Sequence, residues 1–534
     1  MVEGKQIKST RGAVAAYPPE AARIGAQILE AGGNAMDAIA ATCIAGCILD
    51  PASAGIAGYM GSGVVLVADN NGGRVLSIDS NSVLPAEAHE SMFQILPLDE
   101  DTTAVLQGTD IDLDPYFCRV RDDANQIGPL AVGVPGTMGC IGTIWETWGR
   151  LKWSQIVNPS IELLENGLQL AGPDGVKHRP EMLRTLVRLS KTGWRDIYIG
   201  DLGEKIADSV QAAGGILKRE DMAAFEPRIT EPYAITYRNS TVHCPILPNG
   251  ALTTLQALNM LDCLSPQSDD CVQYWHLVAE VLKLAWRDRL RYLADPEFVS
   301  VPVDRLLSKE YAFGRIESIR QFPRYVDKRV PWYSEDRRHG TFHFSSADSD
   351  GNVASVTLTH GSAFGSKFIV PGTGIVLGHP MSLFDPRPGY ANSIAGGKRP
   401  LNNTCPVLAR LPDRDIAVGL PGGRYLLSAN AQIIQRIIDF GATGYEAAVS
   451  PRLHVSSQEP LYLTENATPS IFRGLSEMGH EVKKSIMPEP SLEGSVRQVA
   501  GRAHIAEFLK TESMVRAGGN GWAAGVDLEM NQIS

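Results

Sequence analysis

The feature that most constrains this 534-residue chain is a predicted hairpin that begins at Gly340. Two runs with strand composition, 341–346 and 353–359, flank the sequence Asp-Gly-Asn, which is typical of a tight turn. The ends of an antiparallel pair of strands lie next to each other. We therefore expect Thr341 and Thr359 to lie side by side, with Gly340 directly before the first of them.

This arrangement predicts a nucleophile. A threonine hydroxyl needs a nearby base, and a cut between Gly340 and Thr341 would create one, the α-amine of Thr341. Such an amine has a pKa of roughly 7.7–8.0, close to working pH. Gly340 carries no side chain, so the strained turn of an internal N-to-O acyl shift is accessible. If only the hairpin is considered, the alternative is an ordinary β-hairpin in which the threonines serve only to favour the strand conformation.

The same stretch resembles the start of the small subunit in the γ-glutamyltransferase family of N-terminal-nucleophile hydrolases. That pattern is matched by Thr341, His343, Ser345, Asp350-Gly351-Asn352, Thr357, Thr359 and Phe364-Gly365. Two positions differ, because Phe342 replaces a second threonine and Gly361 replaces an asparagine. Further family blocks follow in order from about Arg11 to Gly525, including Val-Gly-Val-Pro-Gly at 132–136.

The resemblance implies an α+β fold, a four-layer αββα sandwich of the N-terminal-nucleophile hydrolase type, made by autocleavage of one precursor. The large subunit would comprise residues 1–340 and the small catalytic subunit residues 341–534, with the polar segment 321–340 as the tail of the large subunit. These heterodimers could pair as a dimer of heterodimers. From the residues themselves we expect helices at about 19–31, 34–49, 274–295 and 425–440.

Four residues are predicted to be catalytic. Thr341 would be the nucleophile, and the resemblance implies that Thr359 orients its hydroxyl. The order strand–Pro–Gly–Gly–helix at 420–425 exposes backbone N–H groups at a helix start, which suits an oxyanion hole. The family's Gly-Gly pair has this role, which falls here on Gly422 and Gly423; a plain strand-to-helix turn is the alternative.

The predicted substrate pocket departs from the family. By position, Asn81 replaces the arginine that grips a γ-glutamyl α-carboxylate, and Leu383 replaces the acid that holds the α-amine. Asn402 and Asn403 replace a Ser-Ser pair. Together, Asn81, Asn402 and Asn403 could donate to one carboxylate, so we expect a small carboxylate-bearing amide such as oxamate as the substrate. The alternatives are a genuine γ-glutamyltransferase or glutathione hydrolase, and an uncleaved, inactive binding protein.

Composition excludes other classes. The net charge of −11 argues against nucleic acid as a partner. The sequence contains no run of 18 or more apolar residues, so no transmembrane helix is predicted. The first eight residues lack an apolar signal segment, and the eight cysteines show no pairing pattern, so we expect a cytoplasmic protein. Cys43 and Cys47 fit small buried helix residues better than metal ligands. No cofactor and no metal ion is expected.

Overall fold

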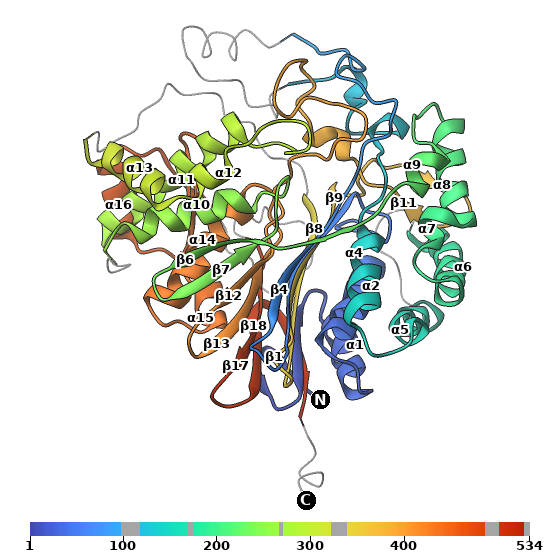
Figure 1. Ribbon diagram of the computed structural model, residues 1–534, viewed down its shortest axis with the longest axis horizontal. Coiled ribbons are helices and arrows are strands. Elements are labelled where there is room, and N and C mark those ends of the chain that lie inside the picture. The colour runs from blue at the N-terminus through green and yellow to red at the C-terminus, as the bar shows by residue number, and fades with distance from the viewer. Residues whose placement is uncertain (98–117, 168–174, 266–270, 322–338, 486–500, 528–534) are drawn as a thin grey trace, which may run out of the picture.

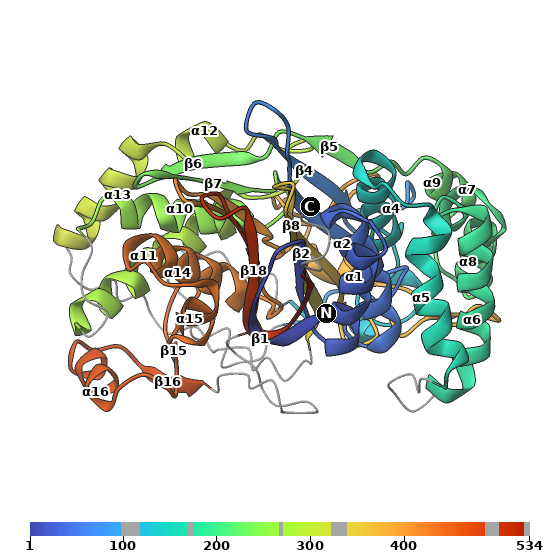
Figure 2. The same cartoon turned by 90° about the horizontal axis from the view of Figure 1, so that it is seen from below.

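The computed structural model describes the chain except for residues 98–117, 168–174, 266–270, 322–338, 486–500 and 528–534. Two layers of β-strands lie between two layers of helices (Figures 1 and 2). This is the αββα sandwich that the family resemblance implies, so the expected α+β class is confirmed. Most of the polar segment 321–340, namely residues 322–338, lies outside the described residues.

The strands of both layers belong to one continuous sheet, in the order β5-β4-β3-β9-β8-β2-β18-β17-β13-β12-β7-β6, with β1 on β18. The first layer contains β2 (Gly12–Ala16), β3 (Met60–Val67), β4 (Arg74–Asn81), β5 (Arg228–Thr230), β8 (His339–Asp348) and β9 (Val353–Ser362). The second contains β6 (Tyr233–Tyr237), β7 (Ser240–Cys244), β12 (Val407–Arg410), β13 (Arg414–Gly419) and β17 (His504–Leu509).

One long strand joins the two layers. The first part of β18 (Met514–Val526) pairs with β17, and its last part pairs with β2, while β1 (Val2–Ser9) lies along its other edge. The layers then pack face to face, and side-chain hydroxyls bridge them. Ser355 Oγ donates to Val418 O and Ser345 Oγ donates to His504 O, both at 3.0 Å.

One helical layer covers the outer face of β8 and β9. It includes α1 (Pro19–Glu30), α2 (Ala35–Leu49), α4 (Thr137–Trp148) and α5 (Trp153–Glu165). The helices expected at about 19–31 and 34–49 are present as α1 and α2, and Asn34 caps α2 in a capping box with Asp37. Small residues let α2 approach the sheet closely: a Cβ on Gly46 would lie 2.4 Å from the ring of Phe344. The same hydrophobic core also includes residues of four further helices, α6 (Gly175–Thr192), α7 (Asp196–Ile199), α8 (Asp201–Ala212) and α9 (Arg219–Ala223).

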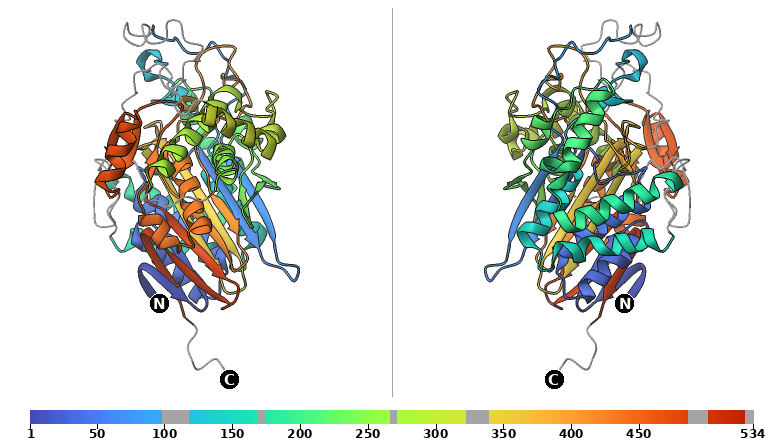
Figure 3. Two further views of the ribbon diagram at one scale, coloured as in Figure 1. Left: turned by 90° about the vertical axis from the view of Figure 1, so that its left-hand side faces the viewer. Right: turned by 90° about the vertical axis from the view of Figure 1, so that its right-hand side faces the viewer.

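The second helical layer covers β6, β7, β12 and β13 (Figure 3). It contains α10 (Ala251–Asp262), α11 (Val272–Tyr292), α13 (Lys309–Gln321), α14 (Tyr425–Asp439) and α15 (Gly444–Val449), with the short α12 (Val303–Leu306) nearby. Both helices expected here, 274–295 and 425–440, are present as α11 and α14 with slightly different ends. No helix in the described ranges is long and apolar enough to span a bilayer.

Two small sheets complete the fold. One pairs β10 (Ile369–Val370) with β11 (Ile375–Val376), and the other contains β14 (Leu453–His454), β15 (Leu461–Thr464) and β16 (Val482–Ser485), with α16 (Pro469–Glu477) beside it. The segment after β11 forms a short 3₁₀ turn, η4 (Pro380–Leu383). It packs against the first layer: a Cβ on Gly133 would lie 2.7 Å from Pro380 and 2.6 Å from Ser82 Oγ.

Candidate active site

The predicted hairpin is formed by β8 and β9, and it pairs Thr341 with Thr359. The pairing continues across the sheet, because Thr359 is also opposite Met60 on β3, and Met60 is opposite Asn81 on β4. Directly paired residues point to the same face of a sheet. The register therefore aligns Thr341, Thr359, Met60 and Asn81 in one row that faces the space between the two layers.

The hydroxyl of Thr359 links the nucleophile to the expected cleavage bond. Its Oγ1 lies 3.0 Å from Thr341 Oγ1 and donates to the carbonyl oxygen of Gly340. It also accepts from the backbone N–H of Gly361 at 2.8 Å. Since the single Thr359 proton is used on Gly340 O, Thr341 must be the donor in the hydroxyl pair. The result is a directed chain of hydrogen bonds from the Thr341 hydroxyl to the carbonyl that it would attack.

A β-bulge lies at this bond. Gly340 is opposite Gly361 and Thr341 is opposite Thr359, so His360 has no partner across the strand. Gly361 has a φ of +95°, and a Cβ there would lie 2.4 Å from Nε2 of His379. His379 Nε2 accepts from the N–H of Ser362 at 2.7 Å. The replacement of the family's asparagine by Gly361 therefore has a local reason, because the His379 ring occupies the space of any side chain.

Next to Thr341 along β8 and β9, three buried polar side chains form hydrogen bonds with one another: His343, Thr357 and Ser345. His343, two residues after Thr341, is hydrogen-bonded through Nδ1 to Thr357 at 2.9 Å and through Nε2 to Ser345 at 3.0 Å. Its ring is parallel to that of His504 on β17, with centroids 6.5 Å apart. Burial and the neighbouring His504 hold the pKa of His343 well below its usual range. This histidine thus fixes the strand as a neutral hydrogen-bonding group at ordinary pH.

The Gly-Gly turn lies at the end of β13, next to His343. A Cβ on Gly419, the last residue of β13, would lie 2.3 Å from the His343 ring. Gly422 and Gly423 follow with φ values of +141° and +56°, which other residues adopt rarely, and α14 begins at Tyr425. In the described part of the chain, the N–H groups of both glycines form no hydrogen bond. The geometry suits an oxyanion hole, and that role stays a prediction.

The predicted pocket residues differ in how their amides are used. Asn81 is fully buried; its Nδ2 donates to Pro400 O at 2.9 Å, and its Oδ1 accepts nothing from a described residue. Asn402 Nδ2 donates to Pro248 O at 3.3 Å and to Asn249 Oδ1 at 3.4 Å, in the segment before α10, and its Oδ1 accepts from Thr404. Asn403 is half-buried, and its Oδ1 accepts from Arg289 at 2.8 Å. Substrate binding by these three residues stays a prediction.

Leu383 belongs to the short 3₁₀ turn after β11, and its part in substrate selection stays a prediction. It ends η4, whose first residue, Pro380, lies near Ser82, next to Asn81, and whose preceding residue is His379. The nearest acid, Asp385, is unavailable for an ammonium ion because Arg387 binds both of its oxygens, at 2.9 and 2.6 Å. The segment that holds the α-amine in the family therefore presents an apolar side chain here.

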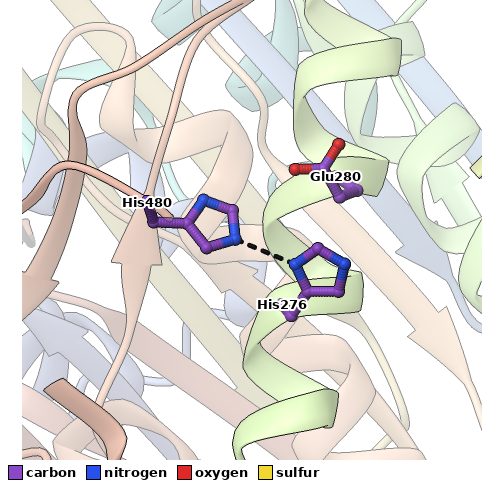
Figure 4. Close-up of side chains that lie close together, drawn as sticks. All are labelled: His276, Glu280 and His480. Carbon is purple, nitrogen blue, oxygen red and sulfur yellow. Dashed lines mark hydrogen bonds between the residues drawn. The ribbon is translucent and has the colours of Figure 1, made fainter. Parts of the chain in front are cut away.

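A group of possible metal ligands lies elsewhere, in the second helical layer. Among the described residues it comprises His276 and Glu280 on α11 and His480 before β16 (Figure 4). His276 Nδ1 and His480 Nε2 are already hydrogen-bonded at 2.9 Å, and His480 Nδ1 donates to Glu459 at 2.7 Å. Lys283 donates to Glu280 at 2.8 Å. An ammonium ion in this position repels a second cation, so we interpret the group as a buried network that joins α11 to β16.

Sequence reasoning missed His379 and the alignment of Met60 with Thr359. Both contacts join segments far apart in the chain, and only the Thr-x-Thr pattern on β9 carried a local signal. The sequence analysis also did not single out Arg424, which directly follows Gly422 and Gly423.

Comparison with known proteins gives a consistent result. The Gamma-glutamyltranspeptidase family model matches residues 21–173 and 170–515. The chain is 31% identical to the acylase ACY 1 proenzyme of Pseudomonas sp. (strain SE83), covering 93% of this chain and 91% of the relative. It is 30% identical to the glutathione hydrolase proenzyme of Bacillus subtilis (strain 168), covering 99% and 94%. Its fold matches a cephalosporin acylase from Bacillus halodurans with a TM-score of 0.79 at 24% identity, covering 98% and 97%.

These findings define an N-terminal-nucleophile amide hydrolase or acyltransferase, and the αββα fold is consistent with that class. The chain belongs to the γ-glutamyltranspeptidase family.

Proposed function

We propose that this enzyme cleaves itself between Gly340 and Thr341 and then hydrolyses small amides that carry a carboxylate, with oxamate as the type substrate. Thr341 serves as the nucleophile in both reactions. The choice of substrate is supported by the predicted pocket, where by sequence position Asn81 and Leu383 replace the two residues that hold the charged groups of a γ-glutamyl substrate in this family.

The hydrogen bonds around Thr359 support a route for self-cleavage. Thr341 Oγ1 attacks the carbonyl carbon of Gly340 while its proton passes to Thr359 Oγ1, and the proton of Thr359 passes to the carbonyl oxygen. The C–N bond then breaks, the nitrogen takes a proton, and an ester remains on Thr341. Water hydrolyses this ester and leaves a carboxylate on Gly340 and a free amine on Thr341.

In turnover the freed α-amine accepts the hydroxyl proton as Thr341 attacks the substrate amide. The negative charge that develops on the substrate oxygen lies at the Gly422–Gly423 turn, where two N–H groups and the start of α14 stabilise it. The amine then protonates the leaving nitrogen, ammonia departs from a primary amide, and water hydrolyses the acyl ester. In each of these steps, the hydrogen bond with Thr359 keeps the Thr341 hydroxyl oriented toward the carbonyl carbon.

The choice of a small acid rests on charge. A γ-glutamyl substrate brings a carboxylate and an ammonium ion, and each charge-assisted hydrogen bond contributes roughly 1.5–3 kcal/mol. Leu383 would leave the ammonium ion against an apolar side chain, and Asp385 is bound by Arg387. Loss of both anchors should cost about 100- to 10,000-fold in kcat/KM. Oxamate needs only the carboxylate half of the pocket.

The test compares kcat/KM for oxamate with that for γ-glutamyl-p-nitroanilide and glutathione, using the processed enzyme and following ammonia or p-nitroaniline release. We expect oxamate to be preferred by at least 100-fold. A γ-glutamyl compound turned over as well as oxamate would refute the small-amide proposal.

A γ-glutamyl hydrolase is the second candidate, and the similarity to the B. subtilis glutathione hydrolase proenzyme over 99% of this chain favours it. The acylase ACY 1 relative, similar at nearly the same identity, shows why overall similarity does not select the acyl group. The same assay distinguishes them, because glutathione hydrolysis above oxamate hydrolysis would support the second candidate.

A further inference from the structure

His379 lies beside the expected cleavage bond but takes no part in the reaction steps of Thr341. It directly precedes η4 and is 3% exposed, and it contacts three consecutive residues of β9. Its backbone N–H donates to His360 O at 3.4 Å, and its Nε2 accepts from the N–H of Ser362 at 2.7 Å. Between these two bonds, a Cβ on Gly361 would lie 2.4 Å from Nε2. The backbone and the ring of one residue thus hold residues 360–362.

The irregularity of β9 gives this contact its importance. The register shifts between Gly340 and Thr341, so His360 is the extra residue of a bulge, and a bulge interrupts the hydrogen bonds between strands. A backbone N–H in a part-buried position costs free energy unless it finds an acceptor. The imidazole supplies that acceptor for Ser362, which requires a lone pair on Nε2 and, in neutral histidine, the proton on Nδ1. His379 therefore acts as a strand partner for this part of β9.

Two hydrogen bonds connect the bulge that His379 holds to the cleavage bond. Gly361 has a φ of +95°, and in this conformation its N–H donates to Thr359 Oγ1 at 2.8 Å. The same hydroxyl donates to the carbonyl oxygen of Gly340 and lies 3.0 Å from Thr341 Oγ1. Because the Gly361 N–H occupies one lone pair of the Thr359 oxygen and Thr341 the other, the Thr359 proton is directed to the carbonyl oxygen. The orientation of this proton thus depends on the backbone conformation against which the His379 ring packs.

We propose that His379 is a positioning residue for self-cleavage, which sets the geometry of the Gly340–Thr341 bond through the hydrogen bonds of Thr359. It touches no reacting atom and exchanges no proton. The turn η4 holds it in place, because its carbonyl oxygen accepts from the N–H and the hydroxyl of Ser382 at 3.3 and 3.0 Å. After cleavage the bulge no longer has to hold a peptide bond in place, so turnover depends less on His379. This inference rests on the proposed self-cleavage and not on the choice of substrate.

The experiment times self-cleavage of precursor made by cell-free translation, on denaturing gels, in wild type, His379→Asn and His379→Gln. The side-chain oxygen of Gln reaches about as far as Nε2 and can accept from Ser362, whereas that of Asn reaches only about as far as Nδ1. We expect His379→Asn to slow cleavage about 10- to 100-fold and His379→Gln to recover most of this loss. In fully processed enzyme, kcat for oxamate or γ-glutamyl-p-nitroanilide, whichever wild type prefers, should fall less than about threefold in both variants. His89→Asn, at an exposed histidine, is the control and should cleave like wild type.

Cleavage of His379→Asn at the wild-type rate would overturn the positioning role. An equal loss in His379→Asn and His379→Gln, or a fall in kcat as large as the fall in cleavage rate, would show a merely structural contribution and would also overturn it. If His379→Asn does not fold, Gly361→Ala replaces it, because the added Cβ would displace the His379 ring, and unchanged cleavage in that variant counts against the role. A wild-type chain that stays at 534 residues would instead refute the proposed self-cleavage, and with it the basis of this inference.

Discussion

The reacting side and the recognition side of this site are built from different parts of the fold. Thr341 and Thr359 are held by strand register, and the Gly422–Gly423 turn presents backbone groups. The predicted recognition side, in contrast, consists of side chains at the end of β4, in η4 and in a loop, namely Asn81, Leu383 and Asn403. One side depends on the backbone and the other on individual side chains.

The difference explains how a family can keep its chemistry while changing its substrate. A strand register that shifts by one residue turns every side chain to the opposite face, so the Thr341–Thr359 pair tolerates little change. A loop side chain such as Leu383 can be replaced without moving the sheet. Relatives of nearly equal similarity carry the names acylase and glutathione hydrolase, which is consistent with this division.

The largest loss of activity is expected from Thr341→Ala, which changes the reacting side. It removes the nucleophile of both self-cleavage and turnover, so the variant should remain one chain of 534 residues with activity reduced about 10,000-fold or more. Wild type should give fragments of 340 and 194 residues on a denaturing gel and by intact mass. A full-length wild-type chain that is active would contradict the assigned cleavage.

A smaller loss is expected from Thr359→Ala. The variant loses the hydroxyl that bridges Thr341 and Gly340, so both self-cleavage and kcat should fall, kcat by about 100- to 1000-fold, comparable to loss of one oxyanion donor. Thr359→Ser keeps the hydroxyl and serves as the control. Rates are measured by time-resolved gels and by steady-state kinetics of the processed fraction. A normal kcat in processed Thr359→Ala would remove this residue from the mechanism.

The same division limits what the sequence predicts. The β8–β9 pairing was predictable because its strands are adjacent in the chain and their turn is distinctive. The contact of Gly361 with His379 joins distant segments, so no local pattern reports it. Backbone conformation is also hidden: sequence alone suggests Gly423→Pro as a way to delete an N–H, but the φ of +56° is incompatible with proline.

The recognition side can be altered without touching the reacting side. Leu383→Asp adds a carboxylate at the segment that holds an ammonium ion in the family, and it should repel oxamate. We expect kcat/KM for oxamate to fall about 10-fold and that for γ-glutamyl-p-nitroanilide to rise by a similar factor. Leu383→Asn has nearly the same shape without the charge and should change both values less. Equal effects of Asp and Asn would show that charge at this position does not select the substrate.

The smallest effect on activity is expected in the buried network that joins α11 to β16, of which Figure 4 shows His276, Glu280 and His480. Burial alone would raise the pKa of Glu459, but hydrogen bonds from His480 and Lys283 outweigh it and lower that pKa from 4.5 to about 2. A carboxyl group with a lowered pKa in the folded state stabilises the fold above its unfolded pKa. This contribution is complete above about pH 4.5 and is lost as the pH falls toward about 2.

Glu459→Gln should therefore lower stability at neutral pH and matter progressively less in acid. Because the side chain is 21% exposed, we expect a loss of about 1–3 kcal/mol rather than the larger cost of breaking a fully buried pair. Asp208→Asn is the control, since the Asp208–Arg219 pair is half exposed and its loss should hardly change the melting temperature. Denaturant unfolding of wild type and both variants between pH 3 and pH 7, alongside kcat at pH 7, makes the test. If the stability difference between wild type and Glu459→Gln stays constant over this pH range, the carboxylate charge does not maintain the network. If kcat at pH 7 falls in Glu459→Gln, this network is coupled to the reacting side.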